Sequence, residues 1–295
     1  DMFDVDLGCY DNWWLPHPPS SMPSGCYIGI ADIVKRFFKD FEVKSNKGLP
    51  VPVVAVGKLG YPDLAEKALR DEKCDMIMLG RPLLADADWC NKAFAGEVED
   101  IRPCIGCQEA CLNEFVEGGH PQCAVNPRTA FEEEYSREVP KAEKKKYVAV
   151  IGAGPAGIVA AETLIKRGHA VDLYERREIG GSLVPGSKPK IKYELDNYLD
   201  YLYNVVEKLK ENEDFTFIKG NAQAESLKAK GYDAILVATG TKQLKPKING
   251  LDTAKVHFAI EVLKNPALVK DVRTVIVLGG GVVGAETAYY LKYEL

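Results

Sequence analysis

The sequence feature that most constrains the fold is a strand, a glycine-rich turn and a helix in immediate succession. An apolar strand is predicted over Tyr147–Ile151, the letters G-A-G-P-A-G follow at 152–157, and a helical pattern continues over Ile158–Lys166. This order is typical of the first unit of a dinucleotide-binding α/β sheet, in which the phosphates lie at the start of the helix. The pattern therefore predicts parallel strands with crossover helices.

Each glycine of this turn has its own task. The first permits the tight turn, the second allows the backbone to approach a pyrophosphate, and the third allows the helix to pack closely on the strand. The residues that we expect at the dinucleotide are Gly152, Gly154, Pro155, Ala156 and Gly157.

A carboxylate and two short turns extend this predicted site. A second strand over Ala170–Tyr174 ends in Glu175, about 20 residues after the motif, where an acid accepts hydrogen bonds from a ribose. Gly181, in a Gly-Gly pair, can bring backbone N–H groups near a phosphate or a flavin. A third apolar strand over Asp233–Ala238 ends in Thr239-Gly240, at the carboxyl end where ligands lie in such sheets. Ordinary turns are the alternative for both.

The same device recurs near the end of the chain. A strand is predicted over Val275–Leu278, the letters G-G-G-V-V-G follow at 279–284, and a helix-like run covers Ala285–Leu291. We expect Gly279, Gly281 and Gly284 at a second dinucleotide, so that one chain binds two.

From Lys146 onward the sequence resembles the two-dinucleotide flavoprotein reductases. This resemblance implies FAD on the first motif, with Glu175 at its ribose and Thr239-Gly240 beside it, and NADH or NADPH on the second motif. The choice between NADH and NADPH stays open, because the acidic or basic residue that distinguishes them is expected beyond Leu295.

The first hundred residues alternate between strand and helix patterns. The predicted strands are Asp4–Leu7, Val51–Val56 and Asp75–Leu79, and the predicted helices are Ile33–Phe41 and Asp63–Leu69. Such alternation implies parallel strands. Three units of this kind cannot close a barrel.

Eight cysteines in a chain without a secretion signal favour metal or redox chemistry over disulfides. Four of them, Cys104, Cys107, Cys111 and Cys123, are spaced C-x2-C-x3-C-x11-C within an irregular Gly- and Pro-containing stretch. Four thiolates are the ligand set of a 4Fe-4S cluster. Zinc is the rival, but it favours two separated C-x-x-C pairs or mixed Cys/His sites, and His120 is the only nearby imidazole. The other four cysteines receive no role.

Two strand ends in the first hundred residues carry groups suited to a phosphate. Gly57 follows one predicted strand, and Gly80-Arg81-Pro82 follows the next. Gly80 can expose a backbone N–H, and the Arg81 guanidinium can fork onto a phosphate. In β/α barrels the phosphate site is frequently built by the loops after strands seven and eight. A surface arginine after a core strand is the alternative.

The balance of charge limits the partners. A net charge of -5 removes the broad electrostatic attraction that nucleic acid or an anionic membrane needs, so we expect a small-molecule partner. No apolar run approaches the roughly 18 residues of a spanning helix, and no basic-then-apolar leader is present. These features predict a cytoplasmic location, whereas the oligomeric state stays open.

The order Gly80-Arg81-Pro82, four-cysteine loop, first glycine motif and second glycine motif resembles one architecture over the whole chain. It is similar to the 2,4-dienoyl-CoA reductase and 2-enoate reductase branch of the old yellow enzyme family. The resemblance implies an FMN barrel whose last strands lie in residues 1–100, with Gly57, Gly80 and Arg81 near the FMN phosphate. The related trimethylamine dehydrogenase has C-x2-C-x2-C spacing, so the x3 spacing after Cys107 favours the reductases.

The implied activity is NAD(P)H-dependent reduction of an activated C=C bond, with electrons passing from FAD through the 4Fe-4S cluster to FMN. The substrate that the resemblance implies is an unsaturated acid or an acyl-CoA. An amine dehydrogenase and a separate electron-transfer subunit are the alternatives. The loop 8–19 is similar to the enoate-reductase branch, which makes His17 a candidate at the substrate, although a Trp/Pro-rich loop can equally pack on its own barrel.

The predicted fold is therefore α/β and consists of consecutive parts. Residues 1–100 are the C-terminal part of a (β/α)8 barrel, 101–130 an iron-sulfur loop, 131–146 a charged linker, 147–270 an FAD-binding domain and 271–295 the start of an NAD(P)-binding domain. The absence of an initiator Met and a helix that runs to Leu295 indicate a fragment, which we expect to be inactive alone.

Overall fold

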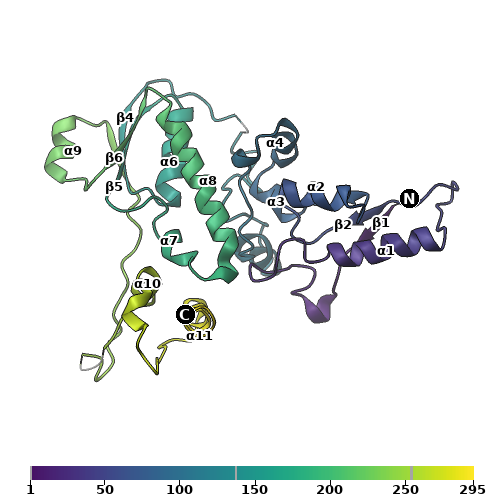
Figure 1. Ribbon diagram of the computed structural model, residues 1–295. Coiled ribbons are helices and arrows are strands. Elements are labelled where there is room, and N and C mark those ends of the chain that lie inside the picture. Colours follow the sequence, from purple (N-terminus) through teal and green to yellow (C-terminus); the bar gives the residue numbers. More distant parts are fainter. Residues whose placement is uncertain (1, 137, 253–254) are drawn as a thin grey trace. The chain divides into compact units, whose positions relative to one another are not determined.

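The computed structural model describes residues 2–136, 138–252 and 255–295 (Figure 1). The chain divides into two compact units, residues 1–135 and 136–295, and each has its own parallel sheet. Residue 137, in the predicted linker, and residue 1 lie outside the described residues.

The first unit contains the three predicted parallel strands. Their order is β1-β2-β3, and the bounds are Phe3–Val5, Val53–Ala55 and Met76–Ile77. Helix α1 covers Ile28–Asp40 and helix α2 covers Pro62–Arg70, so both predicted helices are present with shifted bounds.

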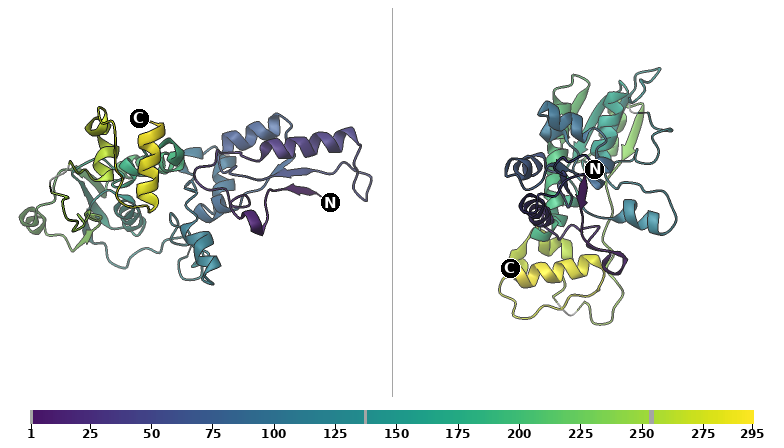
Figure 2. Two further views of the ribbon diagram at one scale, coloured as in Figure 1. Left: turned by 90° about the horizontal axis from the view of Figure 1, so that it is seen from below. Right: turned by 90° about the vertical axis from the view of Figure 1, so that its right-hand side faces the viewer.

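Apolar side chains from alternate strand positions hold the helices of this unit on the sheet. Val5, Val53 and Ala55 pack with Ala31 of α1 and Ala68 of α2, and each of the five is 6% exposed or less. Figure 2 shows α1 and α2 on one side of the three strands. The amphipathic helices thus bury one face against the sheet, as β/α units require.

The rest of the first unit is helical turns and loops. Helix α3 covers Arg81–Ala85, directly after Gly80, and α4 covers Trp89–Ala95. The cysteine stretch is irregular as predicted, except that it contains a short helical segment. The remaining elements are the 3-10 turns Tyr10–Asn12 and Val98–Asp100, the π-helical turn Glu109–Asn113 and α5 at Glu114–Val116.

The second unit is built on a four-stranded parallel sheet of order β6-β5-β4-β7. Strand β4 has the predicted bounds, Tyr147–Ile151, and every neighbouring pair in the sheet is parallel. This arrangement confirms the α/β class. The other elements are β5 Ala170–Glu175, β6 Phe215–Lys219, β7 Ala234–Val237, α6 Pro155–Lys166, α7 Leu183–Gly186, α8 Tyr193–Lys210, α9 Ala224–Lys230, α10 Ala259–Lys264, α11 Val282–Tyr293 and the 3-10 turns Lys190–Lys192 and Pro266–Val269.

Helices cover both faces of this sheet. Helices α6 and α8 contact each other and the strands, and Figure 1 places α9 on the opposite side. Leu227 of α9 packs with Ala149 of β4 and Tyr174 of β5. Burial on both faces explains why β4 is a continuous apolar run.

The strand predicted over Val275–Leu278 is wrong. The described structure assigns this segment to no strand, and all four side chains are at least 36% exposed. A strand forms only when its N–H and C=O groups pair with a neighbour, and no described segment lies beside this one in a sheet. The helix that follows does form, as α11.

No helix among the described residues is long and apolar enough to cross a membrane.

Candidate functional site

The first glycine turn has the close helix-to-strand packing that its sequence predicts. Gly152 has a φ of +107°, a conformation that side chains disfavour. A Cβ on Gly157 would lie 1.8 Å from the carbonyl oxygen of Gly152. Only glycine fits at these two positions, so α6 starts directly against the end of β4.

Glu175 lies at the end of β5 and is 8% exposed. Its Oε2 accepts the N–H of Ala153 at 2.9 Å, and its Oε1 accepts the N–H of Arg177 at 2.6 Å. Because each carboxylate oxygen has more than one lone pair, both remain able to accept a further donor such as a ribose hydroxyl. The carboxylate also holds the glycine turn in place.

The Gly180-Gly181 pair lies over the same turn. The N–H of Gly180 donates to the carbonyl of Ala153 at 2.8 Å. A Cβ on Gly181 would approach the Cα of Gly154 to 3.2 Å. The two backbones approach each other this closely because neither glycine carries a side chain.

The exit of β7 reaches this turn as well. A Cβ on Gly152 would lie 2.4 Å from the carbonyl oxygen of Ala238, the residue before Thr239-Gly240. Gly240 has a φ of +72°. The structure therefore brings together all the candidate residues of the first dinucleotide at the carboxyl end of β4, β5 and β7.

The second glycine motif repeats the local geometry of the first. Gly279 has a φ of +110°, and a Cβ on Gly284 would lie 2.0 Å from the carbonyl oxygen of Gly279. Gly281 is the residue before α11, as Gly154 is before α6. Helix α11 is held by an ion pair between Glu286 and Lys192, with 2.6 Å between Oε1 and Nζ.

The four clustered cysteines line a single hollow of the first unit. About 310 Å³ of space lies between its lining residues when open solvent is counted, so the hollow is open and not an enclosed cavity. Its lining also contains Arg81, Leu84, Gln108 and Val125. The fold thus brings residues from Arg81 to Val125 together at one place.

Backbone N–H groups and neighbouring charges surround the thiols. The N–H of Gly106 donates to Sγ of Cys104 at 3.5 Å. Burial raises the pKa of the Cys111 thiol, and nearby Cys107 raises it further, whereas the charge of Arg81 lowers it. Burial also raises the pKa of Cys123. Across the residues that the structure describes, no three His, Cys, Asp or Glu side chains form a group able to hold one metal ion.

Arg81 connects the cysteine hollow with the loop 8–19. Its Nη2 donates to the carbonyl of Pro18 at 2.8 Å, while its Nη1 is buried and has no hydrogen-bond partner. A buried guanidinium N–H without an acceptor is costly and indicates that an acceptor belongs there. Gly57, with a φ of +112°, and Gly80 follow neighbouring parallel strands and lie beyond their carboxyl ends.

His17 is part of the same loop and is half-buried. Its Nδ1 lies 3.3 Å from the carbonyl of Trp13, and the two rings are 4.5 Å apart. Its own carbonyl accepts a hydrogen bond from the side chain of Gln108. The loop therefore packs on its own unit and on the cysteine stretch, and a role of His17 at a substrate stays a prediction.

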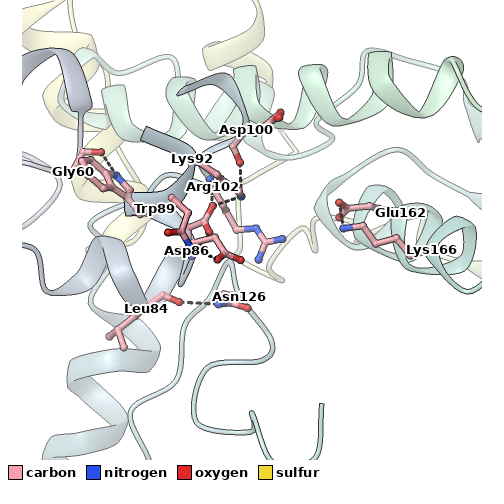
Figure 3. A network of polar contacts seen from close by, with 12 residues as sticks. Gly60, Leu84, Asp86, Trp89, Lys92, Asp100, Arg102, Asn126, Glu162 and Lys166 are labelled. Atoms are coloured by element: carbon pink, nitrogen blue, oxygen red, sulfur yellow. Dashed lines mark hydrogen bonds and ion pairs between the residues drawn. The ribbon is translucent and has the colours of Figure 1, made fainter. Parts of the chain in front are cut away.

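Three polar residues near the hollow were not among the predicted site residues. Asp86 and Asn126 connect the ends of the cysteine stretch to the segment around α3 (Figure 3). Thr129 makes the same connection as Asn126. In the sequence, Asp86 stands out only as an acid after a short helix, and Asn126 only as the residue before Pro127. Neither feature identifies the group that the side chain contacts in the fold.

The family model for pyridine nucleotide-disulphide oxidoreductases matches residues 146–293. This match covers half of the chain and includes both glycine turns. The chain belongs to the pyridine nucleotide-disulphide oxidoreductase family. Membership implies a flavin and a nicotinamide nucleotide, in agreement with the predicted pair of dinucleotides.

Individual relatives extend the similarity over the whole chain. Cinnamate reductase of Clostridium sporogenes is 37% identical over 100% of the chain, and NADH oxidase of Thermoanaerobacter brockii is 33% identical over 97%. The chain spans only 41% and 42% of their lengths. These relatives confirm the resemblance to the enoate-reductase branch.

A solved structure supports the same placement. The complex of 2-naphthoyl-CoA reductase with 2-naphthoyl-CoA aligns with 98% of the chain and 42% of its own, with a TM-score of 0.82 and 28% sequence identity. The two units of this chain thus align with part of that longer reductase chain.

Proposed function

We propose that the protein containing this chain is an NAD(P)H-dependent ene reductase. When bound, NADH or NADPH, FAD, a 4Fe-4S cluster and FMN supply hydride and electron transfer, in that order, to an activated C=C bond. The observation that carries the proposal is the hollow in which four cysteines meet Arg81. The rest of the chain binds, orients and separates these groups.

Cys104, Cys107, Cys111 and Cys123 would hold the cluster. A 4Fe-4S cluster binds each thiolate to a different iron, so its ligands line a hollow and do not converge on one point. Zinc sites favour two separated C-x-x-C pairs or mixed Cys/His sets, and the spacing of these four cysteines is neither. The N–H of Gly106 at Cys104 is the kind of donor that tunes the potential of such a cluster.

Gly152, Gly154 and Gly157 would leave the backbone open to the FAD pyrophosphate, with Pro155 and Ala156 at the first turn of α6. Glu175 would accept the ribose hydroxyls while it keeps the turn in position. Gly181, Thr239 and Gly240 would border the flavin side of the same cofactor.

Gly279, Gly281 and Gly284 would bind NADH or NADPH in the same manner, since the second turn repeats the geometry of the first. Gly57, Gly80 and Arg81 would hold the FMN phosphate. The buried Nη1 of Arg81 is a donor in need of an acceptor, and a phosphate oxygen satisfies it with a charge-assisted hydrogen bond.

The substrate class follows from the relatives. Cinnamate is an unsaturated acid and 2-naphthoyl-CoA an aromatic acyl-CoA, and these name the substrates of similar proteins. We therefore propose a small unsaturated acid or acyl-CoA. We also propose a cytoplasmic location, because eight cysteines in such a chain favour metal or redox chemistry, which a reducing compartment supports.

The test is purification of the full-length protein without oxygen, with iron, sulfide, FMN and FAD quantified. About four irons and four sulfides per chain are expected, together with both flavins. Cys123→Ser should lose most of the iron, while Cys90→Ser, an exposed cysteine outside the hollow, should keep it.

Turnover then separates the candidate functions. NADH and NADPH should be compared as donors with cinnamate, a dienoyl-CoA and dimethylamine as substrates. Reduction of either C=C substrate supports the proposal. Zinc in place of iron, or oxidation of the amine without reduction of either C=C substrate, overturns it.

A further inference from the structure

Both ends of the cysteine stretch are attached to one three-residue segment, Leu84–Asp86 (Figure 3). At the far end, Nδ2 of Asn126 and Oγ1 of Thr129 both donate to the carbonyl of Leu84, at 2.9 and 2.7 Å. At the near end, the N–H of Arg102 donates to Oδ2 of Asp86 at 2.8 Å. Cys104 and Cys123 lie two and three residues inside these two attachments.

The Asp86 carboxylate is itself fixed. It is 6% exposed, and Nζ of Lys92 lies 2.6 Å from its Oδ2. The same Nζ donates to the carbonyl of Asp100 at 2.8 Å, and the N–H of Asp88 donates to Oδ1 of Asp86 at 3.0 Å. A buried carboxylate that accepts from a cation and two N–H donors is held in one orientation.

The segment is also anchored to the sheet of its unit. The indole Nε1 of Trp89, which is 8% exposed, donates to the carbonyl of Gly60 at 3.0 Å. Gly60 follows β2 and meets Pro82, so the segment around α3 rests on the strand ends. The attachment points of the cysteine stretch therefore belong to a packed frame and not to a flexible loop.

We propose that Leu84 and Asp86 form a clamp that holds the cysteine stretch closed before a cluster binds. Asp86, Asn126 and Thr129 are the positioning residues, and none of them ligates iron. Bringing the ends of a long flexible stretch together costs conformational entropy, and a clamp that does so in advance leaves less of this cost to cluster binding. The inference rests on the proposed iron-sulfur function.

The clamp predicts an effect that differs from a general loss of stability. Loss of one of its hydrogen bonds should loosen Cys123 more than the sheet, since the carbonyl of Leu84 keeps its second donor and the packed core is untouched. The cluster should dissociate faster and show an altered visible circular dichroism spectrum, whereas both flavins should stay bound.

The experiment uses the full-length protein purified without oxygen, with the variants Thr129→Val and Thr129→Ser. Valine has the shape of threonine without the hydroxyl, and serine keeps the hydroxyl. An Fe(II) chelator is added, and loss of the cluster absorbance is followed in time. We expect Thr129→Val to lose the cluster about two- to tenfold faster than the parent, as the loss of one hydrogen bond implies, and Thr129→Ser to behave like the parent.

A chemically matched control is available in the other unit. Thr163 is exposed and donates its Oγ1 to the carbonyl of Val159 at 2.8 Å, so Thr163→Val removes the same kind of bond elsewhere. It should leave the rate of cluster loss unchanged. Adding Asn126→Ala to Thr129→Val should increase the rate by more than the product of the single effects, because the two donors share one carbonyl.

The outcomes separate the clamp from the proposed function. If the parent holds iron and sulfide but Thr129→Val loses them at the parent rate, the clamp is overturned and the ene-reductase proposal stands. Loss of FAD and FMN together with the cluster, at a lower unfolding temperature, also overturns the clamp, since it indicates general destabilisation. A parent without iron overturns both proposals.

Discussion

The carboxylate of Glu175 accepts the N–H of Ala153 at 2.9 Å, and it thereby ties the end of β5 to the glycine turn after β4. The residue expected to bind the ribose thus also shapes the turn expected to bind the pyrophosphate. Two parts of one nucleotide site are coupled through a single buried side chain.

This coupling predicts the effect of Glu175→Gln. The amide keeps the shape of the side chain but replaces one acceptor with a donor that faces a backbone N–H. We expect FAD to bind about tenfold or more weakly, as loss of a charge-assisted hydrogen bond implies. The measurement is FAD titration of the flavin-free full-length protein. Glu178→Gln, at a neighbouring exposed position, is the control, and equal affinities for the two variants would contradict the prediction.

The two glycine turns should be separable by mutation. In Gly157→Ala the new methyl group would overlap the carbonyl of Gly152, which should abolish FAD binding. In Gly284→Ala the overlap is with Gly279, which should spare FAD but greatly slow its reduction by NADH or NADPH.

Stopped-flow reduction and bound-flavin content measure these effects. Gly186→Ala is the control, because its Cβ would meet only Leu195 at an ordinary 3.7 Å. Normal flavin reduction in Gly284→Ala would contradict the assignment of the nicotinamide nucleotide to the second turn.

The guanidinium group of Arg81 is expected to bind the FMN phosphate. Arg81→Gln removes the charge, and Arg81→Lys keeps the charge but cannot bond both Pro18 and a phosphate in the same geometry. Both variants should retain less FMN after gel filtration than the parent, with FAD unchanged. Arg70→Gln, which breaks an exposed pair with Glu66, should retain FMN fully. Full FMN occupancy in Arg81→Gln would contradict the assignment.

A buried acid in the second unit predicts a dependence of stability on pH. Burial favours the neutral form of Asp172, but hydrogen bonds from Lys230, Tyr232 and Tyr147 outweigh it and hold the pKa of this carboxyl below its usual value. A lowered pKa stabilises the fold above about pH 4, the unfolded value, and this contribution is lost as pH falls through the folded pKa.

Asp172→Asn should therefore lower the free energy of unfolding by about 2 kcal/mol at pH 7, and the difference from the parent should shrink toward pH 3. Urea denaturation at both pH values measures it. Glu207→Gln, at an exposed pair with Lys210, should change little at either pH. A difference that stays constant with pH would show that the ionised carboxylate is not what stabilises the sheet.

Local signals predicted much of the fold. The tight turns at Gly152 and Gly279 are specified by their own residues, because positive φ and the lack of a Cβ are local requirements. The strands β1 to β5 and β7 and the helices α1, α2, α6 and α11 follow from apolar patterns. Helix α8 was not predicted although Tyr198, Leu202 and Val206 are spaced four residues apart and buried. The five-residue edge strand β6 was not predicted either.

The segment Val275–Leu278 marks the limit of such reasoning. Its composition favours a strand, but a strand also needs a partner, and partners are not encoded in the segment itself. The cysteine stretch has the same limit. Its spacing indicated a set of ligands but not which residues outside the stretch hold it.

The sequence by itself determined which residues can turn, which can ligate and in what order the binding elements follow, since these depend on side-chain chemistry and short spacings. Only the tertiary structure decided that Arg81 lines the hollow of the four cysteines and that Asp86, Asn126 and Thr129 attach the ends of their stretch to one segment. The physical reason is that these contacts join residues far apart in the chain, and packing of α3 and α4 on the ends of the strands brings them within hydrogen-bonding distance.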